Sequence, residues 1–153
     1  MSFRITGLPA EQFQPLFAMS DAELAQRQAR RLTADGPGYP CRVSLTDAAP
    51  GDELILLHYQ HQDADTPFRA SHAIYVRPGE QRYESVAEVP LQLRKRLLSI
   101  RAFDQSGMML EADVADGTAV EPVIARMFGN GKVAYLHLHY ARQGCYAARV
   151  DRA

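Results

Sequence analysis

The stretch Val133–Val150, VAYLHLHYARQGCYAARV, decides how the rest of the chain is interpreted. Leucine and histidine alternate in its first half, residues 142–144 (RQG) supply a turn, and the chain returns through Cys145. Alternation on both sides of a short polar segment that contains glycine predicts a β-hairpin. We therefore expect two adjacent antiparallel strands here, with Cys145 in the returning segment.

Two histidines lie in the first strand of this hairpin. His137 and His139 are two residues apart, and residues at that spacing in a strand point to the same face. Leu136 and Leu138 then point to the opposite face, which we expect to be the core. Imidazole can serve as a general base or a metal ligand, and an activated thiol is a nucleophile. His137, His139 and Cys145 are therefore the candidate catalytic residues.

Composition places the chain among ordinary globular proteins. The 153 residues are 46% hydrophobic and 23% charged, with a formal net charge of -1. This length fits one domain, so we expect a single globular domain over residues 1–153. Nucleic-acid binding normally needs an excess or a patch of Lys and Arg. The longest basic cluster, at residues 94–96, fits the solvated face of a short helix, so no nucleic-acid partner is expected.

The sequence shows no membrane or secretory signal. No apolar run approaches the roughly 20 residues that cross a bilayer. The first residues, MSFRITGLPAEQF, lack the basic and apolar segments of a signal peptide. Two cysteines are too few for a disulfide framework and are expected to be reduced thiols. We therefore expect a cytoplasmic protein with no membrane partner.

The order of the predicted elements indicates an α+β fold. Hairpins dominate and alternating βαβ units are not sustained, which favours a mainly antiparallel sheet built from hairpins, with helices packed on one face. The expected strands cover residues 3–6, 41–45, 53–59, 71–77, 97–103, 108–114, 133–140 and 145–151. The expected helices cover residues 10–19, 21–31 and 118–128, with a short helix beginning near Pro90.

Strand alternation assigns a face to each side chain in these strands. The residues expected to meet the helices are Leu98, Ile100, Leu110, Ala112, Val114, Leu136 and Leu138. The opposite face then carries a polar set, namely Tyr75, Arg77, Ser99, Arg101, Glu111, Asp113, Tyr135, His137, His139 and Arg149.

Three interpretations of this polar face stay open. One face of an antiparallel sheet is often wet, with cross-strand pairs such as Arg101 with Glu111 or Asp113. Alternatively, the face forms a ligand cleft, in which arginine forks hold a carboxylate or phosphate, or it forms a homodimer interface. For the cleft, the candidate ligand-binding residues are Arg77, Arg101, Tyr135 and Arg149.

The spacing of the remaining reactive residues matches no established site. A Cys145–His139 dyad depends on closure of the hairpin, and buried cysteines more often act as small hydrophobic side chains. His137 and His139 need a third ligand such as His72, since two histidines do not fix a metal. His58 and His72 lie in apolar strands and are expected to be core histidines.

Metal and cofactor motifs are also missing from the sequence. His61, Asp63 and Asp65 alternate in the expected polar loop over residues 60–70, but their spacing fits no metal motif. There is no G-x-G-x-x-G, P-loop, H-E-x-x-H, G-x-S-x-G or C-x-x-C motif. We therefore predict no metal and no cofactor.

Four stretches carry a family resemblance: PCRVSLTDAAPGDELILL (40–57), SHAIYVR (71–77), RAFDQSGMMLEADV (101–114) and HLHYARQGCYAARV (137–150). Together they resemble the bacterial domain-of-unknown-function family number 1203, over residues 3–152. The resemblance implies a single-domain bacterial protein. It implies no activity and carries no catalytic residues over to this chain.

The residues therefore support two hypotheses of different classes. The first is a small-molecule binding protein or enzyme whose ligand is an anionic metabolite, held at the His/Arg-lined sheet face near the 133–150 hairpin. The second is a non-catalytic homodimeric interaction protein that uses the same face. A metal-dependent hydrolase is a third and more distant alternative.

Overall fold

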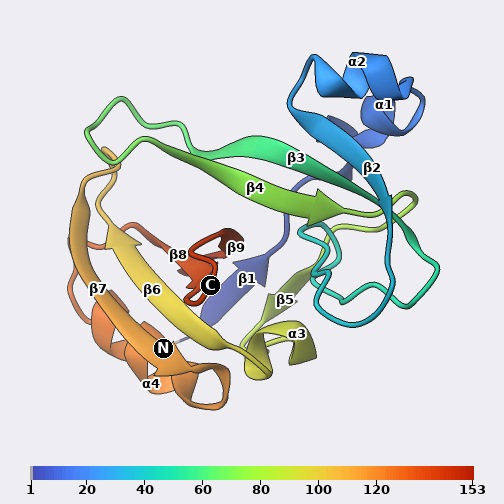
Figure 1. Cartoon of the computed structure of the whole chain (residues 1–153). Helices are drawn as coiled ribbons and strands as arrows, with labels where there is room; N and C mark the ends of the chain where they lie inside the picture. Colours follow the sequence, from blue (N-terminus) through green and yellow to red (C-terminus); the bar gives the residue numbers. More distant parts are fainter. Residues whose placement is uncertain (1) are drawn as a thin grey trace.

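Two antiparallel β-sheets form the framework of the computed structural model, which describes residues 2–153 (Figure 1). The large sheet has the order β5 (Glu84–Val86), β1 (Phe3–Thr6), β9 (Tyr146–Arg152), β8 (Tyr135–Tyr140), β6 (Leu97–Phe103) and β7 (Met109–Asp116). The small sheet has the order β2 (Ala29–Thr33), β3 (Glu53–Gln62) and β4 (Ala70–Val76). With its short helices, this architecture confirms the predicted α+β fold with mainly antiparallel pairing.

One face of the large sheet is covered by the longest helix. Helix α4 (Val120–Phe128) follows the 3-10 turn η2 (Gly117–Ala119) and buries Val120, Ile124 and Met127 at helical spacing. These side chains pack with Leu136 and Leu138 of β8 in the main hydrophobic cluster. The prediction that the two leucines face the core is therefore confirmed. No helix within residues 2–153 is long and apolar enough to cross a membrane.

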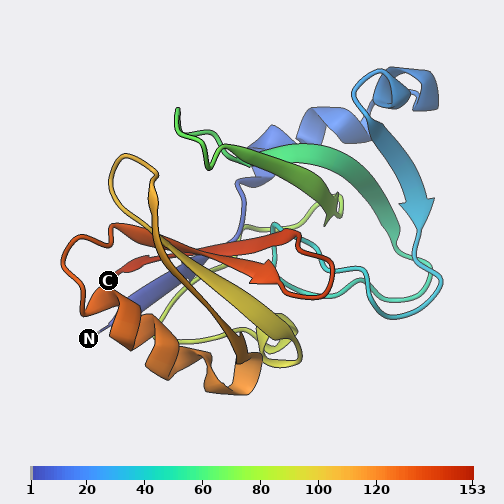
Figure 2. The ribbon, with the colours of Figure 1, turned by 60° about the vertical axis from the view of Figure 1, so that its left-hand side comes forward.

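The small sheet covers the other face of β8 and β9 (Figure 2). Ile55 and Leu57 of β3 and Ile74 of β4 belong to a second hydrophobic cluster, which also contains Tyr146 of β9. The histidine face is therefore not a wet surface, because a second layer of β-structure lies on it. Sequence alternation within one strand could not show this covering layer.

A β-bulge in the central hairpin brings Tyr146 onto the histidine face. His137 pairs with Arg149 and Leu138 with Ala148, but the register then shifts and His139 pairs with Tyr146. A bulge places two residues of one strand opposite one residue of its partner. Tyr146 consequently projects toward the small sheet, where it stacks on a residue of β3.

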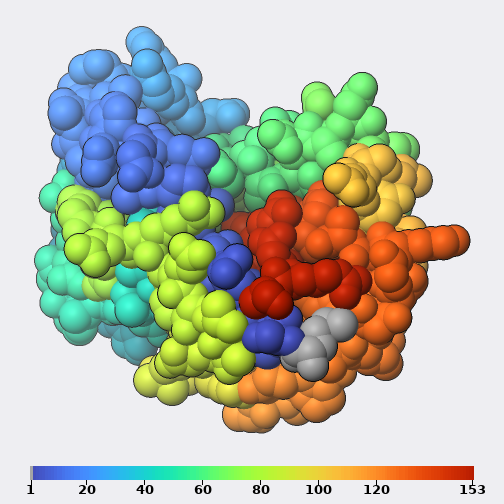
Figure 3. Space-filling model, turned by 180° about the vertical axis from the view of Figure 1, so that it is seen from behind, coloured from blue at the N-terminus to red at the C-terminus, as the bar shows by residue number. Residues whose placement is uncertain are grey.

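The tips of two hairpins lock the sheets together. Thr66 in the β3–β4 turn donates its hydroxyl to the carbonyl oxygen of Gly107 in the β6–β7 turn at 3.1 Å. Gly107 has a φ of 90°, and a Cβ at this position would lie 2.3 Å from the Cβ of Ala64. The two tips, green and gold, touch in Figure 3. Only glycine fits this combination of backbone angle and close approach.

The N-terminal third differs from the predicted helices. The 3-10 turn η1 (Ala10–Gln12) and helices α1 (Gln14–Phe17) and α2 (Asp21–Ala25) are short. The helix expected over residues 21–31 ends early, because Gln28 has a φ of 55° and the next residues form β2. Strand pairing of β2 with β3 outweighs the weak helical pattern there.

Two further predictions of secondary structure were wrong. Residues 41–45, expected as a strand, form turns held by bridges from Pro40 to Asp47 and from Cys41 to Tyr75. Strand β3 continues to Gln62, so His61 lies in a strand and not in a loop. The expected helix near Pro90 is α3 (Leu91–Arg94).

Strand β7 is turned over relative to the prediction. Leu110, Ala112 and Val114 were expected to face the core, yet all three are exposed. Glu111 and Asp113 instead face α4, where both carboxylates pair with Arg126. The predicted cross-strand pairs with Arg101 are therefore absent, since Arg101 lies opposite Ala112.

Candidate functional site

The structure adds a third histidine to the predicted pair. His61 of β3 reaches across from the small sheet, with its ring centroid 5.0 Å from that of His139 and 6.2 Å from that of His137. Tyr146 stacks on His61 with 5.3 Å between the ring centroids. The predicted catalytic histidines are thus together, within an aromatic contact between the two sheets.

These histidines are enclosed. His137 is 4% exposed and His139 is 1% exposed. The Nδ1 of His139 donates to the carbonyl oxygen of Gly144 at 3.0 Å, since a carbonyl can only accept. The buried Nδ1 atoms of His61 and His137 have no hydrogen-bond partner within residues 2–153. Packing therefore holds the rings of His61 and His137, whereas a hydrogen bond also fixes the ring of His139.

Burial keeps the three imidazoles neutral. Desolvation lowers the pKa of His137 to about 2, and the neighbouring His139 and His61 add to this effect. Burial likewise lowers the pKa of His139 to about 3 and that of His61 to about 4. At neutral pH these rings carry no positive charge with which to hold an anion, and they are poor bases.

The alternative metal arrangements are not assembled. Within residues 2–153 no three His, Cys, Asp or Glu side chains are placed so that they could hold one metal ion. His72, the suggested third ligand, is partly exposed, and its Nδ1 accepts from the backbone N–H of Ala73 at 2.8 Å. His58 is also exposed, so the prediction of two core histidines was wrong.

The candidate ligand-binding residues fall into separate places. Arg101 lies opposite His137 and donates to the hydroxyl of Ser99 at 3.2 Å, and burial lowers its pKa. Arg77, at the end of β4, pairs with Asp52 and Glu80, each at 2.9 Å. Arg77 is therefore occupied by carboxylates and does not join the histidine face.

Tyr135 and Arg149 line a surface depression of about 630 Å³, together with Lys132 and Arg152. The guanidinium of Arg149 lies 4.2 Å from the centre of the Tyr135 ring and binds the Asp151 carboxylate with both Nε and Nη2. Arg152 donates to the carbonyl oxygens of Phe128 and Val133. Both arginines thus already have partners in the protein.

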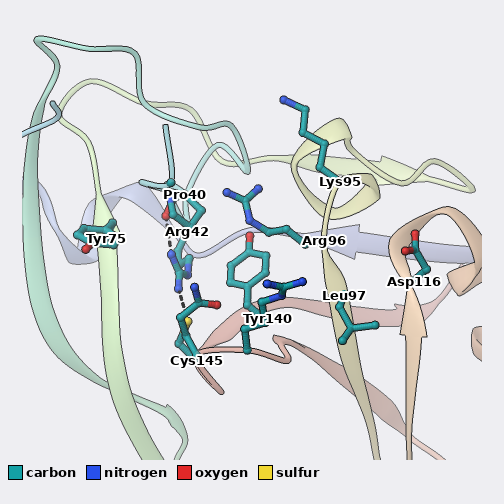
Figure 4. A pocket seen from close by; sticks show the side chains of 12 residues that line it. Pro40, Arg42, Tyr75, Lys95, Arg96, Leu97, Asp116, Tyr140 and Cys145 are labelled. Atoms are coloured by element: carbon teal, nitrogen blue, oxygen red, sulfur yellow. Dashed lines mark hydrogen bonds between the residues drawn. The ribbon is translucent and has the colours of Figure 1, made fainter. Parts of the chain in front are cut away.

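A different pocket, of about 530 Å³, opens beside the β8–β9 turn (Figure 4). Four basic side chains line it, which are Arg42, Lys95, Arg96 and Arg142. Asp116 is the one acidic side chain in its wall, and Cys145 is the one thiol. The remaining lining residues are Gly38, Pro40, Tyr75, Leu97, Tyr140 and Gln143.

Arg42 forms the floor of this pocket and is almost fully buried, with 1% exposed. Its Nε donates to the carbonyl oxygen of Tyr146 at 2.7 Å, and its Nη1 to that of Pro40 at 2.6 Å. Its Nη2 contacts the Sγ of Cys145 at 3.0 Å. None of the ion pairs among residues 2–153 involves Arg42. A guanidinium is therefore buried here without a carboxylate.

The ring of Tyr140 contacts both Arg42 and a second arginine. The guanidinium of Arg42 lies 4.9 Å from the centre of the Tyr140 ring, and that of Arg96 lies 5.1 Å from it. The Tyr140 hydroxyl donates to Oε1 of Gln92, and burial raises the pKa of this phenol. Arg96 also pairs with Asp47 at 3.2 Å. The aromatic ring thus holds two cations at a fixed spacing.

The one acidic side chain in the wall, Asp116, makes its hydrogen bonds within its own turn. Oδ1 of Asp116 accepts from the backbone N–H of Thr118 at 3.1 Å and from its hydroxyl at 2.8 Å, which caps the turn η2. Lys95 and Arg142 are exposed at the rim. The pocket consequently combines a buried cation with a positively charged opening.

The sequence reasoning placed Cys145 in the site but missed Arg42 and the pocket itself. Arg42 lies in a segment that alternates like a strand, which suggested an outward-facing side chain. The cluster at residues 94–96 was interpreted as a solvated helix face, although Lys95 and Arg96 both line the pocket. The sequence contained two separate indications of this pocket, the basic cluster at residues 94–96 and the glycine- and proline-rich segment around Gly38 and Pro40.

Comparison with known families gives a match over most of the chain. The sequence model of the family described as "Protein of unknown function (DUF1203)" matches residues 38–152. This confirms the family resemblance, with the match beginning at residue 38 and not at residue 3. No curated protein and no solved structure matches the chain. The pocket of about 530 Å³ that Arg42 lines is called the Arg42 pocket, and all twelve of its lining residues lie within the matched range.

Proposed function

Because the chain belongs to the DUF1203 family, whose function is unknown, we propose a function from the Arg42 pocket: the protein binds a small anionic metabolite there. The ligand carries a carboxylate or phosphate group, which is the chemistry that an arginine fork recognises. A pocket of about 530 Å³ is within the usual size range for small-molecule sites.

The burial of Arg42 without a carboxylate is the observation that carries this proposal. Removing a charge from water is costly unless a partner compensates for it. An arginine has five N–H donors, and only three hydrogen bonds link this guanidinium to Tyr146, Pro40 and Cys145. A bound anion would supply the missing negative charge at the pocket floor.

The other basic side chains explain how such an anion would reach Arg42. Lys95 and Arg142 are exposed at the rim, and the partly buried Arg96 lies on the Tyr140 ring, which Arg42 also contacts. Basic residues that line a concave, partly desolvated site raise the local concentration of anions. Positive charge is thus present both at the exposed rim of the pocket and at the buried Arg42.

Cys145 gives the pocket a chemical group beyond binding. It is 7% exposed, it lines the pocket, and its sulfur contacts the Arg42 guanidinium. Its sulfur is therefore placed where a ligand held by the basic side chains of this pocket would lie.

A thermal-shift series tests the binding proposal. Inorganic phosphate, malate and citrate are compared with neutral compounds of similar size, at constant ionic strength, because a ligand that binds the native state must stabilise it. We expect at least one anion to raise the midpoint of the wild type, and Arg142→Met to lose most of that rise. Arg30→Met is the matched control, since Arg30 is an exposed arginine of β2 outside the pocket. No anion-dependent rise, or equal loss in both variants, contradicts the proposal.

The alternative function, a homodimer formed through the histidine face, has less support. His137 and His139 are covered by the small sheet, so they are not available to a second copy. A dimer that leaves the two sheets packed together must use another surface.

A further inference from the structure

Strand β7 is an open edge of the large sheet. It lies last in the strand order, beyond β6, and Figure 1 shows it at the outer side of the sheet. Unpaired backbone groups on an edge strand are a template for pairing with another strand, and proteins often protect such edges with lysine, proline or shortened strands. Strand β7 is eight residues long, and its sequence MLEADVAD contains neither lysine nor proline.

The exposed apolar side chains of the molecule gather at this edge. Four of the six large hydrophobic side chains that are exposed within residues 2–153 belong to the β6–β7 hairpin, namely Leu97, Met108, Leu110 and Val114. Leu110 is 41% exposed and Val114 is 56% exposed. With Ala112, they form an apolar row along one face of β7, whereas its charged residues Glu111 and Asp113 lie on the opposite face.

The backbone of the same residues points away from β6. The N–H of Gly117 donates to the carbonyl oxygen of Arg96 at 2.8 Å, at the start of β6. Because backbone N–H and C=O groups alternate in direction along an antiparallel strand, those of residues 111, 113 and 115 also point toward β6. The N–H of Val114 donates instead to Oδ1 of Asp113 at 2.8 Å. Ala112 and Val114, which present apolar side chains, therefore also direct their backbone groups outward, although Asp113 holds the N–H of Val114 in the single chain.

From this coincidence we propose that β7 pairs antiparallel with β7 of a second copy of the chain, so that the two large sheets continue into one. The two-fold axis passes beside Ala112. Ala112 then pairs with its own counterpart, and Leu110 pairs with Val114 of the partner, in both directions. The Ala112 pair exchanges two backbone hydrogen bonds, as hydrogen-bonded pairs in antiparallel ladders do, and pairing at Val114 replaces the bond of its N–H to Asp113. A two-fold interface of this kind uses the same patch on both copies.

This register is favoured because it matches the apolar row with itself. Every exposed apolar side chain of the row then meets another, and cross-strand apolar pairs stabilise a sheet. On the opposite face, Glu111 lies across from Asp113 of the partner. That repulsion is reduced because Arg126 of α4 already pairs with both carboxylates in each chain. Axes at Glu111 or Asp113 would instead place identical carboxylates directly opposite each other.

Sedimentation of the full chain tests the existence of the dimer. We expect a dimer whose fraction rises with concentration, and a monomer for Val114→Lys, because lysine would bring two like charges into the apolar row. Leu91→Lys is the matched control, since Leu91 is 66% exposed on α3 and lies outside β7. A cooperative thermal transition of each variant, measured at a concentration where the wild type is monomeric, verifies that both variants fold. A wild type that stays monomeric, or a Val114→Lys variant that stays dimeric, overturns the proposal.

Cysteine cross-linking tests the register. Hydrogen-bonded pairs have their Cα atoms about 5.5 Å apart, within the range of about 4.4–6.8 Å that a disulfide spans. Ala112→Cys should therefore form a cross-linked dimer under mild oxidation with diamide. Val114→Cys should not, because the two copies of residue 114 are separated by four residues of strand, about 14 Å. The opposite pattern overturns the proposed axis, and neither result depends on anion binding.

Discussion

Nη2 of Arg42 lies 3.0 Å from Sγ of Cys145, although 103 positions separate the two residues in the sequence. The contact joins the turn segment before β3 to the β8–β9 turn, and both residues line the same pocket. It unites a buried positive charge with the one thiol that the pocket contains. The predictions below follow from this pair, from the histidine cluster behind it, and from the hairpin tips that hold the sheets together.

Arg42→Met should destabilise the fold. The substitution leaves the carbonyl oxygens of Tyr146 and Pro40 without their buried donors, and each such loss costs about 1–3 kcal/mol. We expect the free energy of unfolding in urea to fall by about 2–4 kcal/mol, after allowance for the favourable removal of a buried charge. Arg30→Met, on an exposed position of β2, should change it by less than about 0.5 kcal/mol. Equal stability of the two variants would show that Arg42 is not a structural anchor.

Cys145 should react with iodoacetamide before Cys41 does in the native protein. Cys145 is 7% exposed and lines the pocket, whereas Cys41 is 0% exposed. Peptide mass mapping after a short exposure should therefore find the label on Cys145, and the anion that stabilises the protein should slow that labelling. Preferential labelling of Cys41, or labelling of Cys145 that no anion affects, would contradict the placement of the thiol in the binding pocket.

Acidic pH should destabilise the protein through the histidine cluster. The pKa values of His61 and His139 are lowered from 6.5 to about 4 and about 3, because burial disfavours the charged rings. The unfolded chain therefore binds more protons than the folded chain below pH 6.5. Stability is complete above that pH and falls as the pH drops toward the folded values, by at most about 1.4 kcal/mol per pH unit for each histidine.

A variant separates this effect from general acid denaturation. His61→Gln removes one of the titrating rings. The slope of the unfolding free energy against pH, between pH 6 and pH 4.5, should therefore decrease by up to about 1.4 kcal/mol per pH unit, which is the contribution of one proton. His58→Gln, at an exposed position of the same strand, is the matched control for the loss of one histidine. Equal slopes for the wild type and both variants would mean that folding does not remove the His61 ring from water.

Gly107→Ala should loosen the contact between the hairpin tips. The added Cβ would lie 2.3 Å from the Cβ of Ala64, at a residue whose φ is 90°. Gly144→Ala shares the unfavourable angle, with a φ of 80°, but meets nothing within 4 Å. We expect thermal unfolding to show a loss of about 1 kcal/mol for the Gly144 variant, from backbone strain alone, and a larger loss for the Gly107 variant. Equal losses would indicate that the tips can separate without cost.

The hairpins could be predicted from the sequence because their signals are local. Alternation of His137 and His139 with Leu136 and Leu138 separates the two faces of β8, and the leucine face enters the helix-covered core as predicted. The same reasoning failed for Leu110 and its neighbours in β7. Alternation identifies two faces of a strand but not which one is covered, and α4 covers the face that carries the carboxylates.

The candidate site depended on contacts that no local pattern contains. His61 meets His139 only because the small sheet folds over the large one, and Tyr146 joins them only because a bulge shifts the register of β9. Arg42 is buried by residues more than 100 positions away, so its segment resembled an ordinary strand. Long-range packing of this kind is specified by the whole chain.

Diffraction from crystals grown with the anion that gives the largest thermal shift is the most direct test of the Arg42 pocket. We expect that anion between Arg42 and Arg142, within hydrogen-bond distance of at least one guanidinium and close to the sulfur of Cys145. The proposed function would be contradicted by an empty Arg42 pocket with the same anion bound instead in the surface depression beside Lys132 and Arg149.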